Sequence, residues 1–156
     1  MTDTIEETVE GVPEPVPQPD YREMTRILMA EVREFGHPMT GWFVGRQLLL
    51  LTSTGAKSGE PRTVPLAYTR DGENYIVTAS KGGAPTHPAW YHNFLADPNG
   101  TIELDLQTIK VRASVAEGAE RQRLWDQHVA IHTGIGEYPQ KTDRIIPVVV
   151  LTPVAD

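Results

Sequence analysis

The stretch TGAKSGEPR, residues 54–62, decides the fold, because it places a tight turn between two runs of β-forming residues, 48–52 and 63–69. A second glycine-bearing turn, ASKGG at residues 79–83, ends a third such run, residues 75–79. Glycine allows the backbone to turn sharply and allows its N–H groups to approach a ligand closely. The two turns therefore predict strands joined at short loops whose backbone donors are accessible.

Each turn also carries a cation: Lys57 and Arg62 in the first, and Lys81 in the second. Lysine or arginine beside accessible N–H groups forms an anion site, and arginine offers a planar fork to phosphate or carboxylate. A helix start near Thr86 adds further N–H donors. In a chain of net charge −7 this indicates one localised pocket for a polyanionic small molecule. Solvated turn residues are the alternative, and the residue pattern leaves both readings open.

Charge is distributed unevenly along the 156 residues. Residues 1–20 contain six carboxylates and no Lys or Arg, so residues 21–156 carry a net charge of only −1. Prolines alternate through the same acidic stretch, which has too little apolar surface to offset its chain entropy. We expect residues 1–19 to form an extended, disordered arm and residues 20–156 to form a single domain.

Composition narrows the function classes. The acidic balance argues against a nucleic-acid surface, which requires a basic stripe. The chain has no cysteine, and no apolar run approaches the roughly 20 residues of a membrane span. We expect a cytoplasmic protein that is a monomer or a weak homodimer. Peripheral contact with a membrane is compatible with this expectation, whereas stable insertion is not.

Periodicity predicts a mixed fold. An apolar stripe at helical spacing follows the candidate cap Asp20 and stops at Gly36. Strands are expected at residues 48–52, 63–69, 75–79, 101–106, 109–115 and 145–151, with Asp71-Gly72 as a hairpin turn. Helices are expected from a cap at Thr86 and over residues 117–131, and a loop at residues 132–142. About six mostly antiparallel strands with flanking helices predict an α+β domain built on a split β-barrel.

Two familiar nucleotide motifs are absent. The first turn has Ala56 where a P-loop needs glycine before its lysine, and the later Gly134-Ile135-Gly136 lacks the rest of a dinucleotide fingerprint. His128 and His132 are spaced to share one helix face, but no third ligand accompanies them. We therefore expect neither a P-loop nucleotide site nor a metal.

Five segments in register resemble the deazaflavin-dependent nitroreductase family of actinobacteria. They are residues 54–62, 64–72, 79–84, 87–93 and 142–149, and the resemblance extends over about residues 38–153. The resemblance implies the split barrel of the FMN-binding and pyridoxamine-phosphate-oxidase-like proteins. It also implies coenzyme F(420), an 8-hydroxy-5-deazaflavin with a phosphate and an oligoglutamate tail, as a hydride carrier.

The same resemblance implies the cofactor contacts. Lys57, Arg62 and Lys81 would hold the phosphate and tail, with backbone groups around Ser58, Gly59, Gly82 and Gly83. The residues expected to line the deazaflavin are Pro65, Leu66, Ala67, Tyr68, Ala79 and Ser80. Trp90, Tyr91 and Asn93 would shape the wall of this site.

The implied activity is an F(420)H2-dependent reductase that transfers a hydride to a quinone, an activated enone or a nitroaromatic. Ser80 is the candidate hydrogen-bonding group near the ring, and Tyr138 is the candidate proton donor or substrate contact. Ala67, His132 and Ile135 stand where nitroimidazole-activating members carry tyrosines, which favours quinones and enones as acceptors. The alternatives are an FMN-dependent split-barrel reductase and a cofactor carrier without turnover.

Overall fold

A computed structural model describes residues 20–155, so the expected arm at residues 1–19 lies outside the described part. Within that part, seven strands form one antiparallel sheet in the order β2-β1-β5-β6-β7-β4-β3. The elements are α1 (Tyr21–Phe35), β1 (Leu48–Thr54), β2 (Pro61–Ala67), β3 (Thr69–Asp71), β4 (Asn74–Thr78), η1 (Lys81–Gly83), α2 (Ala89–Ala96), β5 (Asn99–Leu104), β6 (Gln107–Val115), α3 (Gly118–Ile131), η2 (Thr133–Lys141) and β7 (Val148–Pro153).

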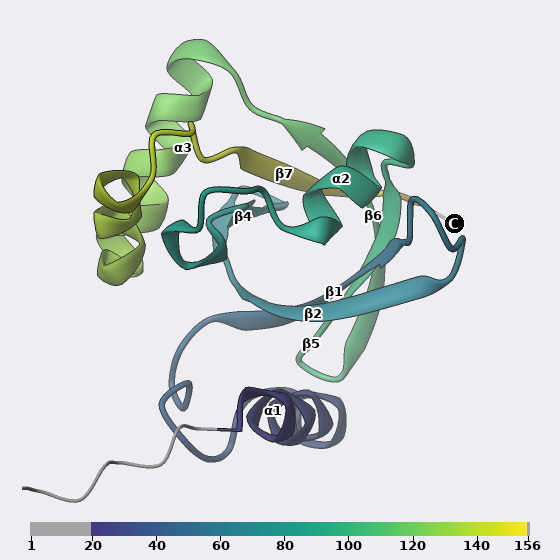
Figure 1. Cartoon of the computed structure of the whole chain (residues 1–156). Helices are drawn as coiled ribbons and strands as arrows, with labels where there is room; N and C mark the ends of the chain where they lie inside the picture. Colours follow the sequence, from purple (N-terminus) through teal and green to yellow (C-terminus); the bar gives the residue numbers. More distant parts are fainter. Residues whose placement is uncertain (1–19, 156) are drawn as a thin grey trace, which may run out of the picture.

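The sheet curls into a half-barrel because its two edge strands are consecutive in the chain. Only Tyr68 separates β2 at one edge from β3 at the other. Beyond β2 the ribbon turns toward β4 and brings the two edges of the sheet round toward each other (Figure 1). The sequence predicted one strand over residues 63–69, and the bend at Tyr68 divides that run in two. The prediction of an antiparallel split barrel is confirmed.

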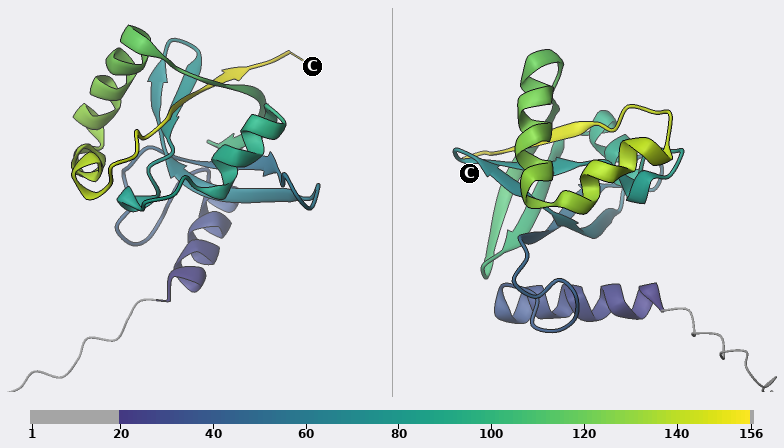
Figure 2. Two further views of the ribbon diagram at one scale, coloured as in Figure 1. Left: turned by 45° about the horizontal axis from the view of Figure 1, so that its top comes forward. Right: turned by 90° about the vertical axis from the view of Figure 1, so that its left-hand side faces the viewer.

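Alternation along β1 separates two layers of apolar packing. Leu49 and Leu51 point into the barrel core, whereas Leu48 and Leu50 pack against Leu28 and Val32 of α1. All four strand leucines are buried, as the uninterrupted apolar run predicted. Helix α1 therefore covers the outer face of β1, on one side of the half-barrel, while α3 and η2 lie along another side (Figure 2).

The boundaries of α1 follow the expected capping chemistry. The Asp20 carboxylate accepts a hydrogen bond from the Glu23 backbone N–H at 3.1 Å. Gly36 ends the helix with φ of 89°, and a Cβ there would lie 3.1 Å from Asp105 Cα. Glycine is thus required both by the left-handed conformation and by the close approach of the β5–β6 turn.

Several elements differ from those expected from the sequence. Helix α2 is capped by Pro88 rather than by Thr86, whose hydroxyl instead accepts from Lys81 Nζ at 3.2 Å. The last strand begins at Val148, after Pro147, which lacks the N–H needed for a sheet ladder. The expected loop at residues 132–142 forms the 3-10 segment η2. None of these changes alters the order of the elements.

Candidate acceptor pocket and cofactor turns

A cavity of about 400 Å³ opens beside the first turn of η2. Its walls include residues from three distant parts of the chain: Ala67, Ser80, and the group His132, Ile135 and Tyr138. These are all four predicted substrate residues together with the predicted hydrogen-bonding serine. The loop before β1 supplies Trp42, Phe43 and Arg46, and η2 supplies Glu137. The sequence did not single out these last four, since none belongs to a matched motif.

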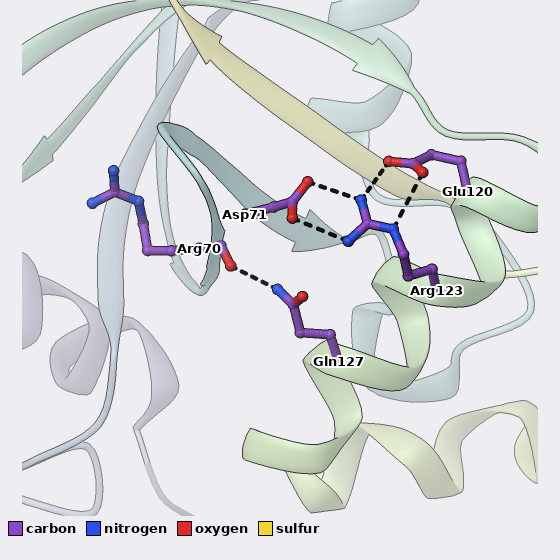
Figure 3. A network of polar contacts seen from close by, with 5 residues as sticks. All are labelled: Arg70, Asp71, Glu120, Arg123 and Gln127. Atoms are coloured by element: carbon purple, nitrogen blue, oxygen red, sulfur yellow. Dashed lines mark hydrogen bonds and ion pairs between the residues drawn. The ribbon is translucent and has the colours of Figure 1, made fainter.

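Helix α3 is fixed against the bend between β2 and β3 by a ladder of side-chain contacts. Arg123 forms a bidentate ion pair with Asp71 at 3.1 and 3.0 Å, and Gln127 Nε2 donates to the Arg70 carbonyl at 2.6 Å (Figure 3). The hydrogen bond to Arg123 lowers the pKa of the Asp71 carboxyl. These contacts set the position of the helix along residues 70 and 71.

Two histidines extend this series of contacts between α3 and the β2–β3 segment as far as the cavity. His128 Nδ1 and Thr69 Oγ1 lie 3.0 Å apart, and His132 Nε2 donates to the Tyr68 carbonyl at 2.8 Å. The two rings are 4.9 Å apart, so the expected placement on one helix face is confirmed. Residues 71, 70, 69 and 68 are thus contacted in turn by Arg123, Gln127, His128 and His132. The last of these side chains, His132, is a wall of the cavity.

The first cation-bearing turn joins β1 to β2 and is supported from α2. Buried Asn93 accepts from the Ala56 backbone N–H at 2.9 Å through Oδ1 and donates from Nδ2 to Ser53 Oγ at 3.1 Å. Asn93 was predicted as part of the cofactor wall. Its contacts make it a support for the turn that carries Lys57.

Within the described residues, no carboxylate neutralises the cations of the two turns. Among residues 20–155, Lys57, Arg62 and Lys81 form no ion pair, whereas Arg33 and Arg123 are each bound to carboxylates. Arg62 reaches only Ser58 Oγ, at 3.5 Å. All three cations are exposed. Positive charge is therefore available to a ligand at both turns.

The second turn is held by a residue to which the sequence analysis gave no role. Arg144 donates to the carbonyls of Ala84 at 2.8 Å, Ala79 at 3.1 Å and Ser80 at 2.8 Å. Its Nη1 also donates to His87 Nδ1 at 2.8 Å, and burial, followed by Arg144 and His92, lowers the pKa of His87. Arg144 lies in the matched segment at residues 142–149, but its partners are about 60 residues away in the chain.

The backbone of this turn is left-handed at two positions. Lys81 has φ of 46° and Gly83 has φ of 81°. A Cβ at Gly83 would lie 3.0 Å from Lys141 Cβ and 3.3 Å from the Tyr138 carbonyl. The glycine therefore allows η1, with Lys81 and Gly82, to lie directly against the η2 segment that walls the cavity.

The remaining predicted cofactor residues divide between core and surface. Ala79 and Trp90 are buried in the barrel core, and Tyr68 packs on that core with its ring centroid 5.6 Å from that of Tyr75. Burial raises the pKa of the Tyr68 phenol. Tyr91 packs against His87 at 4.9 Å. None of these four side chains lines the 400 Å³ cavity.

Pro65 and Leu66 line a second pocket, of about 520 Å³, between α1 and the sheet. Its lining is largely apolar and shares Trp42, Phe43 and Ala67 with the acceptor cavity. The exposed Ser58 and Gly59 complete the turn of the β1–β2 hairpin. Of the predicted cofactor residues, Ala67 and Ser80 line the cavity that gathers the predicted substrate residues, and the others lie around it.

The described residues hold neither a metal-binding cluster nor a membrane-spanning helix. No group of three His, Asp or Glu side chains in residues 20–155 is arranged to hold a metal ion. The helices in this range are also too short or too polar to cross a membrane.

Comparison with known proteins assigns the family. The profile of the F(420)H2-dependent quinone reductases matches residues 21–153. The chain belongs to this family. An F(420)H2-dependent quinone reductase of Mycobacterium tuberculosis is 42% identical over 110 residues, which cover 67% of this chain and 72% of the relative.

Solved structures agree with membership of the F(420)H2-dependent quinone reductase family. An F(420)H2-dependent reductase matches with a TM-score of 0.63 and 40% identity, covering 68% of this chain and 94% of that one. A domain-swapped dimer matches with a TM-score of 0.66 and 36% identity, covering 84% and 95%. A Listeria innocua structure assigned to the pyridoxamine 5'-phosphate oxidases shares the fold alone, with a TM-score of 0.50, 14% identity and coverage of 70% and 85%.

Proposed function

We propose that this protein is a reductase that uses reduced coenzyme F(420) to reduce small, flat carbonyl acceptors, quinones first. The observation that carries the proposal is the 400 Å³ cavity, because it gathers Ser80, His132 and Tyr138 next to the second cation-bearing turn, residues 79–83. Reductases named for this cofactor are similar to the chain in both sequence and structure. The acceptor named for the family, a quinone, is flat and has carbonyls that the polar side chains of the cavity can contact.

The residues of the two turns fit the cofactor that the family implies. A phosphate and an oligoglutamate tail need cations that are not already neutralised, and Lys57, Arg62 and Lys81 meet this requirement. We assign these three to the anionic part of the cofactor, with backbone donors of the two turns. Pro65, Leu66 and Ser80 are assigned to the deazaflavin. When bound, the reduced deazaflavin supplies a hydride.

The chain's own residues then position the acceptor and supply polar contacts. Ser80 and Tyr138 offer hydroxyls inside the cavity, while Phe43 and Ile135 offer apolar surface. An apolar wall excludes water and orients a flat ring, and a few hydroxyls fix its carbonyl. Tyr138 is the substrate contact or proton donor in this arrangement.

Equilibrium titration tests the cofactor assignment against its alternatives. We expect F(420) to bind, seen by fluorescence and absorbance, and NADPH and FMN not to bind. Binding of FMN without F(420) would identify an FMN-dependent reductase instead. Tight binding of F(420) without oxidation of its reduced form by menadione, cyclohexenone or a nitroimidazole would identify a cofactor carrier.

A single variant tests the role of Tyr138. If its hydroxyl donates the proton, Tyr138→Phe should lower single-turnover oxidation by roughly 10²–10⁴ while the affinity for F(420) is retained. If it only contacts the acceptor, the apparent acceptor affinity should fall and the saturating rate should hold. An unchanged rate and affinity would remove Tyr138 from the site.

A further inference from the structure

The hydrogen bond between His132 and Tyr68 fixes which ring nitrogen carries the proton. A carbonyl oxygen can only accept, so Nε2 of His132 must be the protonated nitrogen in the 2.8 Å contact with the Tyr68 carbonyl. In the neutral ring, Nδ1 is then unprotonated and carries a lone pair. In the imidazolium, Nδ1 carries a second proton that it can donate. Protonation of the ring therefore changes Nδ1 from a hydrogen-bond acceptor to a donor and leaves Nε2–H as it was.

This second nitrogen faces the cavity. The side chain of His132 is 92% buried, and Nδ1 has no hydrogen-bond partner among residues 20–155. In the described part of the protein, two side-chain polar atoms are both sealed from solvent and without a hydrogen-bond partner, Arg121 Nε and His128 Nε2. Nδ1 of His132 is not one of them, so it keeps contact with open space. The open space that His132 borders is the 400 Å³ cavity, shared with Ser80 and Tyr138. Nδ1 is thus a buried, unpartnered polar atom presented to the acceptor pocket.

Several titratable groups surround His132. His128, the titratable neighbour on α3, has its pKa lowered to about 4, mainly by burial, so it stays neutral near pH 7 and adds no competing charge. The cavity is also lined by Arg46 from the loop before β1, and by Glu137 and Tyr138 from η2. Of the two histidines, His132 is the one that can exchange protons with the cavity.

We propose that His132 is a catalytic acid of this reductase and protonates the acceptor oxygen from Nδ1. This inference rests on the proposed function. The quinone receives a hydride, which is two electrons and one proton, from the reduced cofactor, and the cofactor is thereby oxidised. The second proton leaves Nδ1–H of His132, a new O–H bond forms at the acceptor carbonyl, and the imidazolium becomes neutral imidazole. Solvent reloads the proton between turnovers, and Tyr138 orients the acceptor.

The ladder along α3 explains how the ring is held for this task. The Tyr68 carbonyl anchors Nε2, while Gln127 and Arg123 keep the helix against residues 70 and 71. An oriented ring loses little freedom on meeting the acceptor.

Two variants of His132 test the inference. His132→Gln keeps an N–H for the Tyr68 carbonyl but has no proton to give. It should lower the single-turnover oxidation of reduced F(420) by menadione roughly 10²–10⁴-fold at pH 6. It should also abolish the fall in wild-type rate as the pH rises. Added imidazole should restore part of the rate to His132→Ala. Gln127→Ala, which removes another ladder contact outside the cavity, should keep the wild-type pH profile.

A second readout does not depend on turnover. In ¹⁵N spectra of the cofactor-free protein, neutral His132 should carry its proton on Nε2, and a proton on Nδ1 would overturn the geometry. A wild-type pH profile in His132→Gln, or no rescue of His132→Ala by imidazole, would overturn the chemistry. These failures differ from failure of the proposed function, in which the wild-type protein itself does not bind or oxidise F(420)H2. If the Gln variant fails to fold, the Ala variant with imidazole and the ¹⁵N spectra still decide.

Discussion

Arg144 Nη2 donates to the Ser80 carbonyl at 2.8 Å, although 64 residues of chain separate the two. The same guanidinium holds the carbonyls of Ala79 and Ala84, so three acceptors of one short turn point toward it. The turn carries Lys81 in a left-handed conformation that a non-glycine residue rarely adopts. A cation from the segment before β7 thus maintains the shape of the turn that we assign to the cofactor.

Arg144→Lys should therefore weaken F(420) binding without removing the local charge. Lysine is a point donor and cannot hold three carbonyls and His87 Nδ1 together. We expect roughly a 10-fold loss of affinity, and a thermal midpoint lowered by roughly 5–10 °C from the unpaired carbonyls. Fluorescence titration and a thermal melt measure the two effects. Wild-type affinity in a destabilised variant would show that the turn keeps its shape without the clamp.

Lys57→Ala and Arg62→Ala should each weaken cofactor binding more than they change the rate at saturation. A charge-assisted contact is worth about 1.5–3 kcal/mol, which corresponds to roughly 10- to 150-fold in affinity. Added salt should reproduce part of the loss through screening. Arg26→Ala is the matched control, because it removes an exposed cation already paired with Glu23 on α1. Unchanged affinity in both turn variants would make these cations ordinary solvated residues.

Burial of His128 should make the protein sensitive to mild acid. Its pKa is lowered from 6.5 to about 4, so between these values the unfolded chain binds more protons than the native state. Stability therefore falls as the pH falls from about 6.5 to 4, by up to about 3 kcal/mol, and this contribution levels off below. Denaturant unfolding of the wild type and of His128→Asn across this window measures the difference. Equal pH slopes in the two proteins would contradict the prediction.

The small side chain of Ala67 should set acceptor preference. It lines both the acceptor cavity and the apolar pocket under α1. Ala67→Tyr should fill part of the cavity and add a hydroxyl, which favours a nitro group over a bulky quinone. We expect the ratio of menadione to nitroimidazole turnover to fall in the variant. A wild-type protein that already turns over the nitroimidazole fastest would refute the pocket argument.

Removal of residues 1–19 should leave the folded domain intact. This prediction comes from the sequence, since the segment is acidic, rich in proline and without apolar periodicity. The thermal midpoint and F(420) affinity of the truncated chain should match those of the full chain within error. A large fall in either would mean that the segment packs on the domain or covers a pocket.

The sequence determined those features that depend on neighbouring residues. Asp20 and Gly36 bound α1, Asp71-Gly72 turns the β3–β4 hairpin, and the apolar run in β1 is buried, because capping, turn chemistry and burial period act within a few residues. The five matched segments also led to the family. The predicted substrate residues proved to share one cavity.

Tertiary structure alone decided how distant residues complete the site. The bend at Tyr68 closes the half-barrel, and its carbonyl orients His132, a contact across 64 residues. Arg144 shapes the turn at residues 79–84, and Asn93 supports the turn at Ala56 from 37 residues away. Such pairings depend on which strand edges and helix faces meet after folding, and no local pattern encodes that. The chemistry of each side chain could be read in advance, but its partner could not.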